Sequence, residues 1–193
     1  MRSLTDFIVS RVRVKLLTIF FSAPEEMFYV RQLVRECGEE INAIRRELTK
    51  LTKAGIVKPQ GRGNRLYFSL NKQYAFYSEL MRLATKTAGL GAAIIKNQQQ
   101  LGKVKYAFLS GRFIRRMPYR QDAVDLLAVG EIVMPQLASI VQQEQAKVKR
   151  EINYSVMTEE EFKFRKSRRD PFILDVLKGS RVMLIGDEEE LAE

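Results

Sequence analysis

The sequence predicts an α+β protein built in two parts that differ in their pattern of elements. In residues 1–75, apolar residues recur at helical spacing and then give way to two extended segments joined by a glycine-rich turn. In residues 103–193, apolar strands alternate with helices, which indicates an α/β arrangement with a mixed sheet. We therefore expect an N-terminal domain over 1–75, a helical connector over 76–102 and a C-terminal domain over 103–193.

Composition excludes several classes of protein. Histidine is absent and Cys37 is the only cysteine, so an internal disulfide, a histidine-based triad and a zinc site of the usual ligands are excluded. The apolar runs fall short of the ~20 residues that span a bilayer. Charged residues interrupt the first 21 residues, which is typical of an amphipathic helix and not of a signal peptide. We expect a cytoplasmic protein with no metal, no cofactor and no membrane partner.

Positive charge is concentrated in the first half of the chain. Residues 1–100 hold 17 Lys and Arg against 8 Asp and Glu, whereas residues 101–193 hold 16 against 15. In residues 41–72 the only acidic residue is Glu47. This distribution indicates a polyanion-binding module attached to a nearly neutral domain, and the alternative is a solvated basic face.

Three helices are predicted before the hairpin. The first has an apolar stripe that ends at Ala23-Pro24, and the second ends at Gly38, which is placed as a C-terminal cap. The third covers 42–54, with Asn42 as its N-cap and Gly55 at its end. Its inward residues are Ile44, Leu48 and Leu51. The segments IVKPQ and RLYFSL then form a hairpin around a GRGN turn.

This order of elements is that of a winged helix-turn-helix. The stretch YVRQLVRECG…NAIRRELTKLTKAGIVKPQGRGNRLYFSLN resembles the ArsR-like winged-helix regulators over about residues 10–75. The resemblance implies binding of double-stranded DNA and regulation of transcription. The metal-sensing cysteines and histidines of some of these regulators are missing, so metal sensing is not carried over.

A recognition helix turns its polar side chains toward the major groove, while the wing reaches phosphates or the minor groove. Arg45 and Arg46 are the expected groove contacts, and Gly61 and Gly63 give the hairpin tip room near the duplex. The alternative is a winged fold that binds only protein. The candidate DNA-binding residues are Asn42, Arg45, Arg46, Thr49, Lys50, Arg62, Asn64 and Arg65.

A homodimer is expected, because two-fold proteins suit palindromic sites. The alternative is that the apolar side chains of the first helix and of the connector pack within the chain. The candidate interface residues are Val9, Val12, Leu16, Phe20, Phe76, Leu80 and Leu83.

In the C-terminal part, strands are predicted at KVKYAFLSG, DAVDLLAVG, EINYSVMT and in the closing helix–strand unit DPFILDVLKGSRVMLIG. Helices are predicted at EIVMPQLASIVQQEQAKVKR and EEEFKFRKSR. This order resembles the minimal nucleotidyltransferases of the DNA polymerase beta-like fold over about residues 103–186. Such enzymes hold two Mg²⁺ ions with three carboxylates, two of them two residues apart on one strand.

The chain departs from this family at the residues that carry its chemistry. The second carboxylate is present as Asp125, but Ala123 and Asn153 stand at the other two positions, and Gly111-Arg112 replaces Gly-Ser. Strand alternation puts Asp122 on the face opposite Asp125. We therefore expect a catalytically inactive domain that serves as a scaffold or sensor.

Basic residues follow the first predicted strand of this domain. The candidate anion-binding residues are Gly111, Arg112, Arg115 and Arg116. The neighbouring Asp125 is interpreted as an ion-pair partner of these arginines and Arg120. Two alternatives to a DNA-binding regulator stay open: an active nucleotidyltransferase, and an antitoxin-like or scaffold protein whose second domain holds a partner protein. A nucleotide is also a possible partner of the C-terminal domain.

Overall fold

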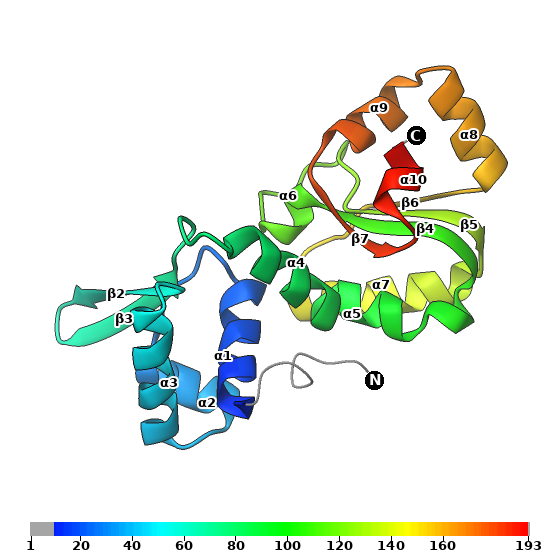
Figure 1. Ribbon diagram of the computed structural model, residues 1–193. Coiled ribbons are helices and arrows are strands. Elements are labelled where there is room, and N and C mark those ends of the chain that lie inside the picture. Colours follow the sequence, from blue (N-terminus) through cyan, green and yellow to red (C-terminus); the bar gives the residue numbers. More distant parts are fainter. Residues whose placement is uncertain (1–9, 193) are drawn as a thin grey trace. The chain divides into compact units, whose positions relative to one another are not determined.

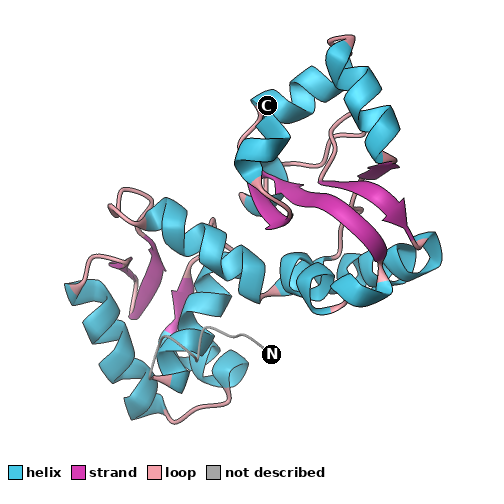
Figure 2. Ribbon diagram, turned by 45° about the vertical axis from the view of Figure 1, so that its right-hand side comes forward, coloured by secondary structure: helices cyan, strands magenta, loops and turns pink. Residues whose placement is uncertain are grey.

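The computed structural model describes residues 10–192, which form two compact units with their boundary between Ala88 and Gly89 (Figure 1). The first unit combines helices with a small antiparallel sheet, and the second packs helices on a mixed four-stranded sheet (Figure 2). The predicted α+β class is confirmed at this level. The expected connector over 76–102 is divided between the units, because one helix ends at the boundary and another begins there.

The first unit contains four helices and three strands among the described residues. The helices are α1 (Arg11–Ser22), α2 (Val30–Cys37), α3 (Ile41–Lys53) and α4 (Tyr77–Thr87). The strands are β1 (Phe28–Tyr29), β2 (Val57–Arg62) and β3 (Arg65–Leu70), in the antiparallel order β1-β3-β2. The three helices and the hairpin expected from the sequence are present. β1 was not predicted from the sequence, because its two residues are too few to show a pattern.

Helix ends in this unit follow their capping residues, with one correction. The Ser10 hydroxyl accepts a hydrogen bond from the Arg13 amide at the start of α1, and Gly38 ends α2 at φ +61°. The expectation that Asn42 caps α3 is wrong. The Glu40 carboxylate accepts hydrogen bonds from the amides of Asn42 and Ala43, so α3 begins at Ile41.

The core of the first unit joins α1, α2 and α3. Leu16 and Phe20 of α1 are fully buried with Leu33 of α2 and Ile44 of α3. Leu16 and Phe20 are therefore core residues of their own unit, which corrects their assignment to a dimer interface. Of the other residues assigned to that interface, Phe76 is 60% exposed, and Val9 lies outside the described residues.

The sheet of the second unit has the strand order β6-β5-β4-β7. Its strands are β4 (Gly102–Ser110), β5 (Leu126–Ile132), β6 (Tyr154–Met157) and β7 (Arg181–Ile185). The pair β5–β6 is parallel, and β4 pairs antiparallel with both β5 and β7, so the expected mixed sheet is confirmed. The expectation that Asp122–Asp125 lie in the second strand is wrong, because β5 begins at Leu126. Asp122 and Asp125 precede the strand, so strand alternation does not decide where their side chains point.

Helices cover both faces of this sheet. They are α5 (Gly89–Lys96), α6 (Gly111–Ile114), α7 (Met134–Val148), α8 (Glu159–Ser167), α9 (Pro171–Lys178) and α10 (Glu188–Ala192), with the 3-10 turn η2 (Gln98–Gln100) before β4. α5 and α7 lie on one face, and α8, α9 and α10 lie on the other (Figure 1). On the second face, Phe162 and Ile173 pack against Phe108 and Val129 of the sheet in one buried cluster.

Candidate nucleic-acid interface

α3 presents a polar, basic face away from the core. Its buried residues are Ile44, Glu47, Leu48 and Leu51, so the apolar stripe read from the sequence is confirmed. The remaining positions of the helix carry the predicted contact residues. Those on α3, all exposed, are Asn42, Arg45, Arg46, Thr49 and Lys50.

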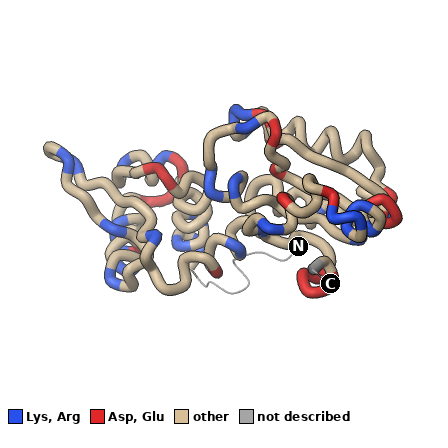
Figure 3. The backbone as a smooth tube through the Cα atoms, turned by 90° about the horizontal axis from the view of Figure 1, so that it is seen from above, with Lys and Arg blue, Asp and Glu red and all other residues tan. Residues whose placement is uncertain are grey.

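The β2–β3 hairpin carries the other candidate residues at its tip. Arg62 and Arg65 pair across the two-residue turn Gly63-Asn64, and all four are exposed. Basic residues gather at this tip (blue in Figure 3). Gly63 takes φ +55°, which is the left-handed region that a tight hairpin turn requires at this position.

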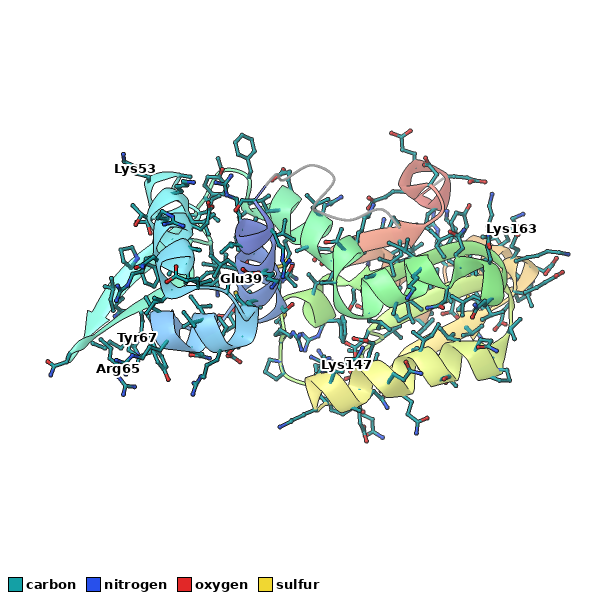
Figure 4. All side chains as sticks on the ribbon, turned by 90° about the horizontal axis from the view of Figure 1, so that it is seen from below. Glu39, Lys53, Arg65, Tyr67, Lys147 and Lys163 are labelled. Atoms are coloured by element: carbon teal, nitrogen blue, oxygen red, sulfur yellow. The ribbon has the colours of Figure 1, made fainter. Side chains whose placement is uncertain are left out.

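The arginines of this face are not paired with any acidic residue that the structure describes. Among residues 10–192, no ion pair involves Arg45, Arg46 or Arg62. Arg65 lies over the ring of Tyr29, with 5.0 Å from the guanidinium carbon to the ring centroid. Tyr29 in turn pairs edge-on with Tyr67, which shares a face of β3 with Arg65 (Figure 4). The guanidinium groups of Arg45, Arg46 and Arg62, which have no acidic partner in the described part of the chain, are available to a polyanion.

Glu47 is the exception to the basic character of α3, and it is buried. Its carboxylate accepts hydrogen bonds from Arg13 Nε of α1 at 2.8 Å and from Lys50 Nζ at 3.0 Å. Burial raises the pKa of Glu47, but the hydrogen bonds from Lys50 and Arg13 outweigh burial and lower that pKa overall. The bridge ties α3 to α1 and holds the Lys50 ammonium, so Lys50 is less free to bind a ligand than Arg46.

We predict that Glu47→Gln destabilises the first unit by about 1–2 kcal/mol at neutral pH, because charged hydrogen bonds are lost. A carboxylate with a lowered folded pKa stabilises the fold above its unfolded value of 4.5, and that contribution is lost as pH falls through the folded pKa. The difference between wild type and variant should therefore shrink at acid pH. Urea unfolding at pH 7 and near pH 3 measures it, and an unchanged difference at both pH values would contradict the bridge.

The two hairpin glycines are predicted to differ in their effect on stability. Gly63→Ala should cost about 1–2 kcal/mol, because a side chain is strained at its positive φ. Gly61→Ala is the matched control, since an added Cβ there meets nothing within 4 Å and its φ is not in that region. Thermal unfolding of both variants tests this, and equal destabilisation would contradict the turn assignment.

The candidate anion-binding residues of the second unit are engaged by the chain itself. The Gly111 amide donates to the Ser180 carbonyl at 2.6 Å, and Arg115 Nη1 donates to Ser180 Oγ at 2.9 Å. Arg112 Nη2 donates to the Pro118 carbonyl at 3.2 Å, and the Arg116 amide donates to the Phe113 carbonyl. The two contacts with Ser180 hold α6 and Arg115 next to the start of β7, and the other two lie within the segment that follows β4.

Asp125 forms an ion pair, but its partner differs from the one expected. Arg150 Nη2 lies 2.9 Å from Asp125 Oδ1 and 3.1 Å from Oδ2, and the carboxylate is buried. The expected pairing with Arg112, Arg115, Arg116 or Arg120 is wrong. The nearest of these in sequence, Arg120, pairs with the exposed Asp122 instead.

Asn153 stands beside this pair and uses both ends of its amide. Its Nδ2 donates to the carbonyls of Arg120 and Ala123 at 2.9 and 3.0 Å, and its Oδ1 accepts from the Tyr119 hydroxyl. A carboxylate at this position could not donate to those carbonyls. The neutral residue therefore fits its contacts with the loop.

No family model, curated protein or solved structure matches this chain. The site is therefore interpreted from its own geometry.

Within the described part of the chain, no three acidic, histidine or cysteine residues are placed to hold a metal ion. Burial raises the pKa of the Cys37 thiol to about 11, so this thiol is protonated and unreactive at neutral pH. None of the described helices has the length and apolar character needed to cross a membrane.

Two basic residues beside the α3 face, Arg31 and Arg35, were not predicted from the sequence, and Lys53 was expected to be a surface charge. Arg31 and Arg35 of α2 and Lys53 of α3 line one open groove together with Arg45 and Arg65. A signal for the first two was present, because they are four positions apart and therefore share one side of a helix.

Proposed function

We propose that the chain is a DNA-binding transcriptional regulator and that its first unit is a winged helix-turn-helix of the ArsR-like type. One observation carries the proposal: an exposed basic face on α3 lies beside a hairpin whose tip bears two exposed arginines, and Arg45, Arg46 and Arg62 have no acidic partner among the described residues. In this proposal α2 and α3 are the two helices of the motif, and the β2–β3 hairpin is the wing. β1 supplies the third strand.

In the proposed mechanism, α3 enters the major groove and reads base edges. Arg45 and Arg46 supply donors suited to the acceptors of guanine, and Asn42 and Thr49 extend the same face. Arg62, Asn64 and Arg65 of the hairpin contact phosphates or the minor groove and fix the register of the protein on the duplex. A homodimer would place two such units on a palindromic site.

We propose that the second unit is a degenerate nucleotidyltransferase-like domain that acts as a scaffold or sensor. Two sets of hydrogen bonds support this proposal. Arg150 Nη2 donates to both carboxylate oxygens of Asp125, and Asn153 Nδ2 donates to the Arg120 carbonyl of the neighbouring loop. Incubation with Mg²⁺ and labelled nucleoside triphosphates should give no incorporation, whereas incorporation that Asp125→Asn abolishes would contradict the proposal.

The proposed function is tested by selecting random duplex DNA on the full-length protein and titrating the winning sequence at two salt concentrations. We expect a defined motif bound at least about a thousandfold more tightly than random DNA. A palindromic motif would also give the half-site spacing of the dimer. Binding that is weak, free of a motif and lost steeply with salt would reduce the interface to a basic surface and contradict the proposal.

A further inference from the structure

An open groove of about 1280 Å³ runs between α2, α3 and the hairpin of the first unit. Its basic lining residues come from all three elements, and none of the described residues that line it is acidic. The basic residues are Arg31, Arg35, Arg45, Lys53 and Arg65. The groove therefore favours an occupant that carries negative charge.

The groove also has an apolar surface. A ligand that bound through its phosphate groups alone would not need such a surface. One face of the hairpin packs on the core through Phe68, and the same face continues beyond the core as Pro59 and Leu66. Leu66 is 49% exposed, and Val30 and Val34 of α2 line the groove with it. An occupant that fits this surface carries apolar side chains as well as acidic ones.

Two kinds of occupant fit less well. The volume exceeds the ~300–1,000 Å³ that is usual for small-molecule pockets. A single nucleic-acid strand needs free aromatic faces on which its bases stack. Here the ring of Tyr29 is covered by Arg65, and Phe68 is buried. The apolar side chains that an occupant can contact are therefore mainly aliphatic.

We propose that this groove binds an acidic amphipathic helix of a partner protein. The apolar side of the helix would pack on Val34, Pro59 and Leu66, and its acidic residues would pair with the arginines at the rim. Arg45 and Arg65 belong to both this groove and the proposed DNA interface, so the partner helix and DNA exclude each other. This exclusion rests on the proposed function, whereas binding of the helix does not.

The test uses the full-length protein and a fluorescent peptide of leucine, glutamate and alanine, about 18 residues long so that it can form a helix. The peptide carries leucine at helical spacing on one side, and its control is a scramble of the same composition. We expect the patterned peptide to bind at least about tenfold more tightly than the scramble. It should also displace the selected duplex in competition.

Two variants separate the groove from the DNA interface. Leu66→Ser should weaken peptide binding about tenfold and leave duplex binding within about twofold, because this side chain is not among the DNA contacts. Arg46→Ala should do the reverse, since Arg46 does not line the groove. If the peptide binds and no duplex does, the proposed function fails while the groove assignment stands.

Three results would overturn the inference. Equal binding of the scramble would show that charge alone attracts the peptide. Peptide binding that is unchanged in Leu66→Ser would place the peptide elsewhere. Tighter binding of a single-stranded oligonucleotide, with the same loss in Leu66→Ser, would assign the groove to nucleic acid.

Discussion

Replacing Arg45 and Arg46 together with alanine should lower the affinity for the selected duplex about a hundredfold, at ~1–3 kcal/mol for each base-reading arginine. The physical reason is that both guanidinium groups are exposed on α3 and no acidic residue among positions 10–192 pairs with them. Competition titrations against duplexes altered at single positions measure the loss. The base preference should relax at the positions that the two arginines contact.

A matched control separates base reading from loss of charge. Arg168→Ala together with Lys178→Ala removes the same charge from exposed positions of the second unit and should change the affinity less than about threefold. Arg62→Ala at the hairpin tip should weaken binding evenly across sequences and reduce the salt dependence by about one ion. An unchanged base preference in the α3 double variant would remove the proposed role of α3.

Local pattern was enough to predict most of the fold. Apolar spacing located α3 and its inward residues, and the turn residues located the hairpin, because both features depend on neighbours in sequence. The start of α3 was misplaced because asparagine is usually the better cap, yet here the Glu40 carboxylate reaches two amides. β1 is defined by its pairing with β3, about 40 residues further along the chain, and no local signal marks it.

Residues of the candidate site could be predicted where they are exposed on a regular helix. They could not be predicted where they depend on contacts between distant parts of the chain. The exposed residues of α3 followed from helical periodicity. The pairing of Arg13 with Glu47 and that of Arg150 with Asp125 join residues 34 and 25 positions apart, and the sequence offered other arginines nearer to both carboxylates. Likewise, Arg31 and Arg35 matter only because folding brings α2 beside the hairpin.

Removing Arg150 should destabilise the second unit by about 3–5 kcal/mol, because Arg150→Met leaves the Asp125 carboxylate buried without its counter-ion. Asp125 is 4% exposed, and the remaining hydrogen bond to its carboxylate comes from the backbone N–H of Asn153 at 3.1 Å. Methionine keeps an unbranched apolar chain next to Phe113, over which the guanidinium lies, so most of the packing should be retained. The variant also loses the hydrogen bond from Arg150 Nη1 to the Met117 carbonyl, which contributes to the expected loss. Urea unfolding followed by circular dichroism suits a chain that has no tryptophan.

The double variant Asp125→Asn with Arg150→Met should recover most of this loss, since no buried charge is left unpaired. Arg120→Met is the control. It breaks an ion pair whose side chains are 56% and 66% exposed, and it should cost less than about 1 kcal/mol. If Arg150→Met cost no more than this control, the buried pair would not stabilise the unit, and Asp125 would need another explanation, such as a role in binding or catalysis. A large loss with recovery in the double variant would instead assign Asp125 a structural role, as expected of a domain without metal catalysis.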